Sequence, residues 1–233
     1  FQIVGDELEA DSALLISNHY SLCDHFVFAY LARLSLNIDS MVLPKINFFT
    51  WYNIWQIPTL KILKNLASCD ENWELDEKSS LLIFKKMICS KVPEWIVLFP
   101  EVNIFNLESS RLQKEMCDKF YLPKFQNLLY PRFSSFYNSI QALSETSFAR
   151  LYDVSIIYYR NPPGGEFKQP SLLELFSLNP SPYVIRIHIK SRMLQRVPVK
   201  KRRLEKWLEM LWADKDKLID SLKEDILKDA VKG

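Results

Sequence analysis

Two polar side chains with catalytic potential, His19 and Asp24, stand five positions apart in the stretch LLISNHYSLCDHF, Leu14–Phe26. Histidine is the side chain best suited to accept a proton near neutral pH. A carboxylate bonded to its other ring nitrogen fixes the tautomer and stabilises the protonated ring. The pair therefore predicts a general base with an orienting acid. Asp24 also has a structural interpretation, because Ser21 and Asp24 have capping-box spacing; the two roles are compatible.

A second candidate loop is FPEVN, Phe99–Asn103, which also follows a short apolar run. In α/β sheets, ligands bind at the loops that follow the carboxyl ends of strands. The sequence contains no G-x-S-x-G motif, which would mark a serine nucleophile. A base without a nucleophile in the protein indicates that the substrate supplies the attacking hydroxyl.

The elements that must position these loops alternate between short apolar runs and segments of helical periodicity. Strands are predicted at Ala13–Ser17, Met41–Lys45, Glu94–Glu101, Leu151–Tyr159 and Tyr183–Arg192. Helices are predicted at Ser21–Leu34, Asp76–Val92, Ser109–Tyr121 and Asn138–Thr146, with one long amphipathic helix, or two in series, from Lys200 onward. This order predicts an α/β fold with a mixed, largely parallel central sheet flanked by helices and a C-terminal amphipathic helix.

The segment Ile46–Leu63 is unusually aromatic, with five aromatic residues and no charge between Phe48 and Trp55. Such a segment fits a core helix. It also fits a segment at a membrane interface, because Trp and Tyr suit the level of the lipid headgroups. The sequence leaves both interpretations open.

Other polar residues have simpler explanations. The basic cluster Lys200–Arg203 fits a solvated helix start, although contact with anionic headgroups is an alternative. We expect His25 to be a packing residue on an apolar helix. His188 alternates with isoleucines in a predicted strand, so we expect it on the exposed face.

The composition narrows the class of protein. With 48% apolar and 25% charged residues in 233, the chain fits a single globular domain, residues 1–233. A net charge of +2 gives no support to a nucleic-acid partner. Four scattered cysteines predict neither a disulfide framework nor a zinc site. The sequence has no apolar run of membrane-spanning length and begins with Phe1, and we expect a fragment that lacks an N-terminal membrane anchor.

Several blocks occur in an order that is more specific than any one of them. These are ISNHYSLCDHF, VLFPEVN, NLLYPRFSSFYNSIQAL, YDVSIIYY, RIHIKSRMLQRVP and WLEMLWADKDKLIDSL. The first resembles the N-H-x4-D block, and the second the F-P-E-G block, of the PlsC-like glycerolipid acyltransferase superfamily. The later blocks look like the lysocardiolipin and lysophosphatidylinositol acyltransferase branch, in its fungal form. The resemblance runs from about Leu14 to Leu222.

This resemblance implies transfer of an acyl group from acyl-CoA to a free hydroxyl of a lysophospholipid or lysophosphatidic acid. His19 would be the general base and Asp24 its orienting acid. The expected partners are acyl-CoA as co-substrate, the lysophospholipid acceptor and a membrane, with no cofactor and no metal. The expected location is the endoplasmic reticulum membrane, with a cytosolic active site.

Five further residues are expected to bind substrate: Asn18, Pro100, Glu101, Asn103 and Arg132. Arg132 is the best remaining candidate for a phosphate or CoA contact, because guanidinium suits such groups; a structural ion pair is the alternative. For Glu101 the alternative is a role in shaping the loop, and for Pro100 it is ending the strand.

The chain departs from the family pattern at two places. Val102 and Asn103 stand where the F-P-E-G block has Gly and a small polar residue, and valine suits neither a positive φ nor close approach to a phosphate. The stretch SCDEN before WELD, Trp73–Asp76, contains no Arg, although the resemblance implies one. Lys61 or Lys64 could replace it only without the bidentate fork. The alternative function is therefore a catalytically weak homologue that binds lipid or acyl-CoA in a structural or regulatory role.

Overall fold

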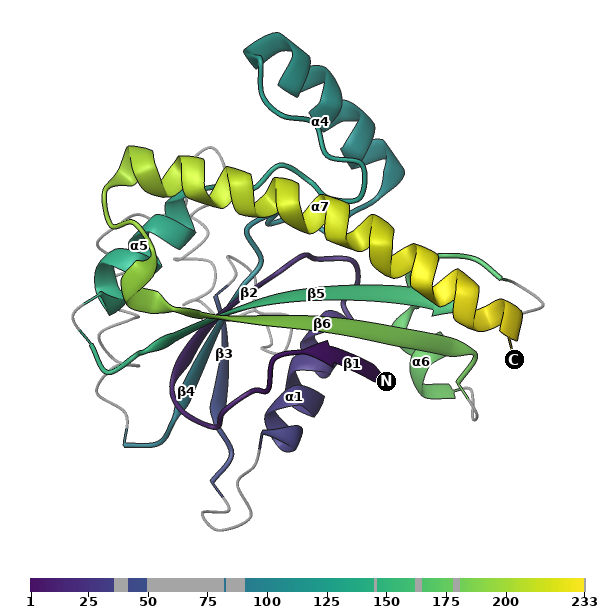
Figure 1. Ribbon diagram of the computed structural model, residues 1–233, viewed down its shortest axis with the longest axis horizontal. Helices are drawn as coiled ribbons and strands as arrows, with labels where there is room; N and C mark the ends of the chain where they lie inside the picture. Colours follow the sequence, from purple (N-terminus) through teal and green to yellow (C-terminus); the bar gives the residue numbers. More distant parts are fainter. Residues whose placement is uncertain are drawn as a thin grey trace, which may run out of the picture.

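The computed structural model describes residues 1–35, 42–49, 82, 91–144, 146–161, 165–177 and 181–232. Within these residues, six strands form one sheet in the order β1-β6-β5-β2-β4-β3 (Figure 1). Their bounds are β1 (Gln2–Gly5), β2 (Ala13–Ser17), β3 (Lys45–Phe49), β4 (Glu94–Leu98), β5 (Arg150–Arg160) and β6 (Tyr183–Met193).

The sheet is mixed and largely parallel, as predicted, because the pair β5–β6 is antiparallel while the other neighbours run parallel. All five residues of β2 and all five of β4 are buried, which is typical of strands covered on both faces. Leu15 of β2 lies opposite Val97 of β4 and Tyr152 of β5, so β2 occupies the centre of the sheet.

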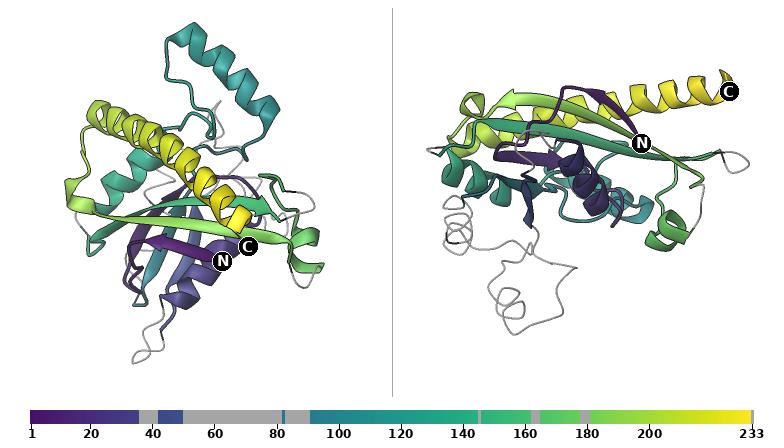
Figure 2. Two further views of the ribbon diagram at one scale, coloured as in Figure 1. Left: turned by 45° about the vertical axis from the view of Figure 1, so that its right-hand side comes forward. Right: turned by 90° about the horizontal axis from the view of Figure 1, so that it is seen from below.

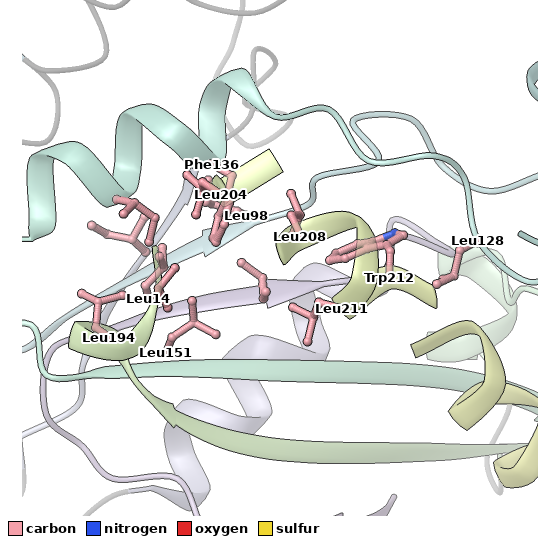
Figure 3. Close-up of a cluster of buried hydrophobic side chains, with 14 of the residues drawn as sticks. Leu14, Leu98, Leu128, Phe136, Leu151, Leu194, Leu204, Leu208, Leu211 and Trp212 are labelled. Atoms are coloured by element: carbon pink, nitrogen blue, oxygen red, sulfur yellow. The ribbon is translucent and has the colours of Figure 1, made fainter. Parts of the chain in front are cut away.

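Helices cover the sheet on both faces. The described helices are α1 (Asp24–Leu34), α4 (Leu107–Phe120), α5 (Ser134–Leu143), α6 (Leu172–Ser177) and α7 (Lys201–Lys232), with a short 3-10 turn at Leu194–Arg196. Alternate residues of β2 enter two cores: Leu15 packs with α1, and Leu14 packs with α5 and α7. Figure 3 shows part of the second core, and Figure 2 shows α1 and α7 on opposite sides of the sheet.

The predicted second strand, Met41–Lys45, is wrong in position. The strand is β3, Lys45–Phe49, so the start of the aromatic segment is extended rather than helical. Its residues add an edge strand beside β4, which offers five backbone partners in register. The rest of that segment, the predicted helix Asp76–Val92 apart from residues 82, 91 and 92, and the stretch before WELD lie outside the described residues.

The predicted exposed face of β6 is largely covered. Arg186 is 8% exposed, because its guanidinium bonds to Gln2 beside it and to Asp229 at the end of α7. His188 is half-buried rather than a surface residue. Both changes follow from β1, a strand that pattern reasoning missed, and from α7, which is one continuous helix of 32 residues.

Candidate active site

The two candidate loops meet at one edge of the sheet because β2 and β4 are parallel neighbours. The first loop follows Ser17 and leads into α1, and the second follows Leu98 and leads into α4. The two loops also bond directly, since the Phe105 N–H donates to the carbonyl of His19 at 2.8 Å. This is the edge at which α/β sheets carry their ligands.

His19 and Asp24 form a direct hydrogen bond, with 2.9 Å between Nδ1 of the imidazole and Oδ2 of the carboxylate. Asp24 is fully buried and His19 is 6% exposed. The same carboxylate oxygen accepts the backbone N–H groups of Tyr20, at 2.8 Å, and Ser21, at 3.0 Å. Its other oxygen accepts the hydroxyl of Tyr158 at 2.6 Å. Because an ionised carboxylate can only accept, Nδ1 carries the proton, which leaves the Nε2 lone pair available to accept one.

The bond from Ser21 also explains where α1 begins. The predicted start at Ser21 is three residues too early, because residues 21–23 form a turn and the helix begins at Asp24. Half of the predicted capping box is present: the Asp24 carboxylate accepts the Ser21 N–H, while the Ser21 hydroxyl accepts the Cys23 N–H. Asp24 therefore closes this turn and holds His19 with one carboxylate.

Tyr158 of β5 is a site residue that sequence reasoning missed. It lies 134 positions from Asp24, so no local spacing could indicate the contact. Burial, followed by the nearby Asp24 charge, raises the pKa of its hydroxyl well above the usual value. The hydroxyl therefore stays protonated and donates to Asp24 at neutral pH.

Aromatic rings enclose the imidazole of His19. The Phe99 ring stacks on it with 4.2 Å between centroids, and the His25 ring meets it edge-on at 5.7 Å. His25 is buried against Phe99 and Phe48, which agrees with its predicted packing role but places it beside the site. Burial first, and then the neighbouring His19, lowers the pKa of His25, so His25 is neutral at pH 7.

Asn18 is fully buried and faces the sheet. Its side-chain amide donates to the carbonyl of Ile156 at 2.9 Å and accepts the Ile156 N–H at 2.8 Å. This pair of bonds continues the β2–β5 ladder one step beyond Ser17. Asn18 therefore fixes the backbone immediately before His19.

The second loop combines buried and exposed candidates. Glu101 is 1% exposed, and its Oε2 accepts the Leu129 N–H at 3.2 Å. Asn103 is exposed and Arg132 is half-buried. The carbonyl of the buried Pro100 accepts the Arg132 N–H at 2.8 Å. The structure thus brings Pro100 and Arg132 together by their backbones and directs Glu101 inward.

Val102 keeps the backbone conformation that a glycine would have. Its φ is 63°, in the left-handed region that β-branched residues rarely adopt. The Val102 N–H bonds to the carbonyl of Phe99, and the Asn103 N–H bonds to the carbonyl of Glu101. Val102 thus has the positive φ that valine does not favour, and two backbone hydrogen bonds hold it in the turn.

Two further observations concern metal ligands and cavities among the described residues. Among them, no group of three His, Cys, Asp or Glu side chains is arranged to hold a metal ion. A cavity of about 90 Å³ beside the pair is lined by Tyr20, Tyr158 and Lys223, among others, but not by His19. Asp24 does not line this cavity either.

Known proteins resemble this chain along nearly all of its length. Residues 177–229 match the family described as Acyltransferase C-terminus. The chain is 27% identical over 226 residues, 93% of its length, to the Arabidopsis thaliana protein named "Probable 1-acyl-sn-glycerol-3-phosphate acyltransferase 5". It is 24% identical over 228 residues (93%) to the Homo sapiens 1-acyl-sn-glycerol-3-phosphate acyltransferase gamma and over 225 residues (94%) to the Caenorhabditis elegans lysophosphatidylinositol acyltransferase 10.

The chain spans 55% of the length of each of these three relatives. No solved structure matches it.

Proposed function

We propose that this chain transfers an acyl group from acyl-CoA to a free hydroxyl of a lysophospholipid or lysophosphatidic acid. The proposal proceeds from its membership of the PlsC-like glycerolipid acyltransferase superfamily, which its relatives support. The observation that carries the proposal is the buried His19–Asp24 hydrogen bond of 2.9 Å, with Asp24 held by three further donors.

In the proposed reaction, Nε2 of His19 accepts the proton of the acceptor hydroxyl as its oxygen attacks the thioester carbonyl. A C–O bond forms and the C–S bond breaks, and the proton passes from the imidazolium to the departing CoA sulfur. Asp24 stabilises the imidazolium between these steps, because its carboxylate already accepts the Nδ1 proton.

Cys23 lies in the same loop but is a poor candidate for a covalent nucleophile. Its thiol is fully buried and lies 3.6 Å from the carbonyl of Pro170, to which it donates. Burial raises the pKa of this thiol above its ordinary value, so the reactive thiolate is scarce at neutral pH. Direct attack by the acceptor hydroxyl is therefore the step that these residues favour.

The proposed setting is a membrane surface, with the endoplasmic reticulum as the compartment and a cytosolic active site. Relatives whose names denote lipid acyltransferases support the lipid surface in this proposal. In the described part of the chain, no helix combines the length and apolar character needed to span a bilayer. Protease protection of the full-length protein in sealed microsomes tests the orientation: digestion of the His19 loop from outside is expected, and full protection contradicts it.

The test of function uses the full-length protein in membranes, labelled acyl-CoA and a panel of lysophospholipids that includes lysophosphatidic acid. Wild type is expected to acylate at least one acceptor, and His19→Ala to transfer at least about 100-fold more slowly. The alternative, a catalytically weak lipid-binding homologue, rests on the missing Arg before WELD. It predicts equal signals from the two proteins, or none with any acceptor.

A further inference from the structure

A basic surface lies at the edge of the sheet opposite the candidate active site. The strand β5 begins at Arg150 and runs parallel to β2, and Arg150 lies opposite Met193, the last residue of β6. The chain therefore leaves β6 for α7 at the edge where β2 begins, whereas His19 follows the end of β2. Figure 1 shows the start of α7 beside α5. A ligand bound at this end is separate from the His19–Asp24 pair.

Cations gather where the chain enters α7. Residues 196–206 contain six basic residues and a single acidic one, Glu205. The basic residues, all of them exposed, are Arg196, Lys200, Lys201, Arg202, Arg203 and Lys206. Within the part of the chain that the structure describes, none of the six forms an ion pair. The positive charge of this segment is therefore not neutralised by the described protein.

This concentration of one charge is unfavourable in the protein alone. Arg202 and Lys206 lie four positions apart on a helix, where like charges repel. The first turn of α7 contains no acidic residue, although negative charge is the kind that stabilises the amino end of a helix. Both effects are relieved when an anion lies over the cluster. They favour an anionic partner over a simply solvated helix start.

A cavity of about 690 Å³ opens beside the cluster, and Arg196 belongs to both. Its volume is in the range of sites that hold small molecules. The segment after β1 contributes three carboxylates to its lining, and β6 and the chain that follows contribute cations. The charged residues that line it are Asp6, Glu7, Glu9, Arg150, Lys190, Arg192 and Arg196.

Two of the three lining carboxylates already have partners. Glu9 forms an ion pair with Arg150 at 2.8 Å, and the carboxylate of Asp6 accepts the Ser191 N–H at 2.7 Å. Glu7 is then the remaining carboxylate of the lining, against Lys190, Arg192 and Arg196. The charge left for a ligand is therefore positive.

Arg192 is held in a way that suits a phosphate. Its guanidinium lies 5.9 Å from the centre of the Trp207 ring, and its nearest described carboxylate, on Asp153, is 4.0 Å away. Its Nε is buried and has no hydrogen-bond partner among the described residues. The planar guanidinium can donate two parallel hydrogen bonds to a phosphate group.

Exposed apolar side chains beside these cations indicate the kind of anion. Met193, which lines the cavity, is 40% exposed, and Val199, next to Lys200, is 46% exposed. Met210, one turn after Lys206, is 61% exposed. A soluble phosphate compound gains nothing from such side chains. A lipid surface offers phosphates to the cations and apolar chains beneath them.

We propose that this surface docks on the anionic phospholipid headgroups of a membrane. The basic surface consists of the cavity and the residues Arg192, Arg196, Lys200–Arg203 and Lys206. Charge complementarity carries the inference, because clusters of four to eight basic residues on an amphipathic helix are typical of such contacts. The inference goes beyond the proposed function, since none of these residues belongs to the loops that carry His19 and Glu101. It assigns the start of α7 a membrane contact of its own.

The test measures hydrogen–deuterium exchange of the peptide covering residues 194–206 in the full-length protein. The bilayers are phosphatidylcholine alone, or phosphatidylcholine with about one third phosphatidylserine. Exchange is expected to be at least about fivefold slower with the anionic bilayer, the scale of one cation at a charged surface. Salt at about 1 M, where the Debye length is about 3 Å, should remove the difference. Equal exchange with the two bilayers at low salt overturns the proposal.

Matched variants locate the contact. Lys200→Gln combined with Arg203→Gln should reduce the slowing by the anionic bilayer to less than about twofold. Lys217→Gln combined with Lys228→Gln removes the same charge from exposed positions further along α7 and should leave the slowing unchanged. Equal reductions in the two double variants would mean that net charge alone attracts the protein, and they overturn the proposal.

A soluble phosphate compound is the competing occupant of the cavity. Inorganic phosphate or glycerol 3-phosphate, added without bilayers, should leave exchange of the peptide unchanged. Slowing as strong as that by the anionic bilayer would assign the cavity to a soluble ligand and overturn the membrane contact. All exchange is measured without acyl-CoA. An enzyme that proves inactive therefore contradicts the proposed function and leaves this test intact.

Discussion

The two loops at the carboxyl edge of the sheet hold their acidic residues in opposite ways. Both oxygens of Asp24 are bonded, to four donors between 2.6 and 3.0 Å. Glu101 has one backbone donor, the Leu129 N–H at 3.2 Å, and its Oε1 is buried without a hydrogen-bond partner among the described residues. In the proposed reaction, the carboxylate of Asp24 is pre-organised for the charge that would appear on His19, whereas the carboxylate of Glu101 is buried with fewer donors.

The backbone conformations of the two loops also differ. The turn before α1 uses ordinary conformations and is closed by Asp24, whereas the turn after β4 places Val102 at a φ of 63°. Residues in sparsely populated conformations persist only where their surroundings fix them, and they gather at functional sites. The comparison teaches that the His19–Asp24 pair is held mostly by bonds within its own loop, while the loop that encloses His19 contains a strained turn.

The largest effect is expected from Asp24→Asn. The amide group presents N–H groups to donors and removes the charge that stabilises the imidazolium, so kcat should fall about 100-fold or more. The free energy of unfolding should fall by about 2–3 kcal/mol. Acyl transfer and thermal unfolding measure the two effects. The control is Asp229→Asn, whose side chain is exposed although its partner Arg186 is buried. Because the amide oxygen can still accept from Arg186, kcat should not change and stability should fall by less than about 1 kcal/mol. Retention of most activity in Asp24→Asn would show that the first loop is structural.

Tyr158→Phe should have the next largest effect. It removes one donor, at 2.6 Å, from Asp24 and leaves the ring packing intact. The expected loss is about 1–2 kcal/mol of stability and several-fold in kcat. The matched control is Tyr159→Phe, one residue along β5, whose ring packs on Phe167. If Tyr158→Phe and Tyr159→Phe lose the same stability and kcat, the bond from the Tyr158 hydroxyl does not help to hold Asp24 in place.

Val102→Gly tests the strained loop. Glycine adopts a positive φ without steric penalty, so stability should rise by about 1 kcal/mol. Tyr121→Gly is the control, because Tyr121 also has a positive φ, at the end of α4, and is 97% exposed. Both should raise the unfolding temperature, and only Val102→Gly should change the rate or the acceptor range. Loss of an existing activity in Val102→Gly would mean that valine is a specific adaptation.

The smallest effect concerns pH. The folded-state pKa of His25 is lowered, so the folded protein binds this proton less readily than the unfolded chain does. Stability is therefore complete above about pH 6.5, the unfolded value, and falls as the pH drops below it. His25→Phe should flatten this dependence by under about 1 kcal/mol between pH 7.5 and 5.5. Thermal unfolding at both pH values measures it, and an unchanged slope would place the titration elsewhere.

Local pattern predicted those parts of the fold and site that depend on nearby residues. The strands Ala13–Ser17 and Leu151–Tyr159 are short and mostly apolar segments, and the His19–Asp24 contact spans five positions of the chain. The predicted position of the edge strand β3 was four residues too early, because the sequence KINFF is as compatible with a helix as with a strand.

Contacts between distant segments could not be predicted. Asn18 was expected to bind substrate. Its side-chain amide bonds to Ile156, which is 138 positions away. Contact between Asn18 and a substrate stays a prediction. The bond between Tyr158 and Asp24 likewise joins β5 to α1 across 134 positions. Such pairs depend on how α1, β2 and β5 pack, which no spacing within one segment encodes.

The central claim is that His19, and not merely the pocket around it, carries the reaction. The most direct measurement compares kcat for His19→Ala and His25→Phe in the full-length protein with its best acceptor. The two histidines are both buried, with 5.7 Å between ring centroids, so either substitution disturbs the same pocket. We expect kcat to fall at least about 100-fold for His19→Ala and less than about fivefold for His25→Phe. Equal losses, or an active His19→Ala, would contradict the account.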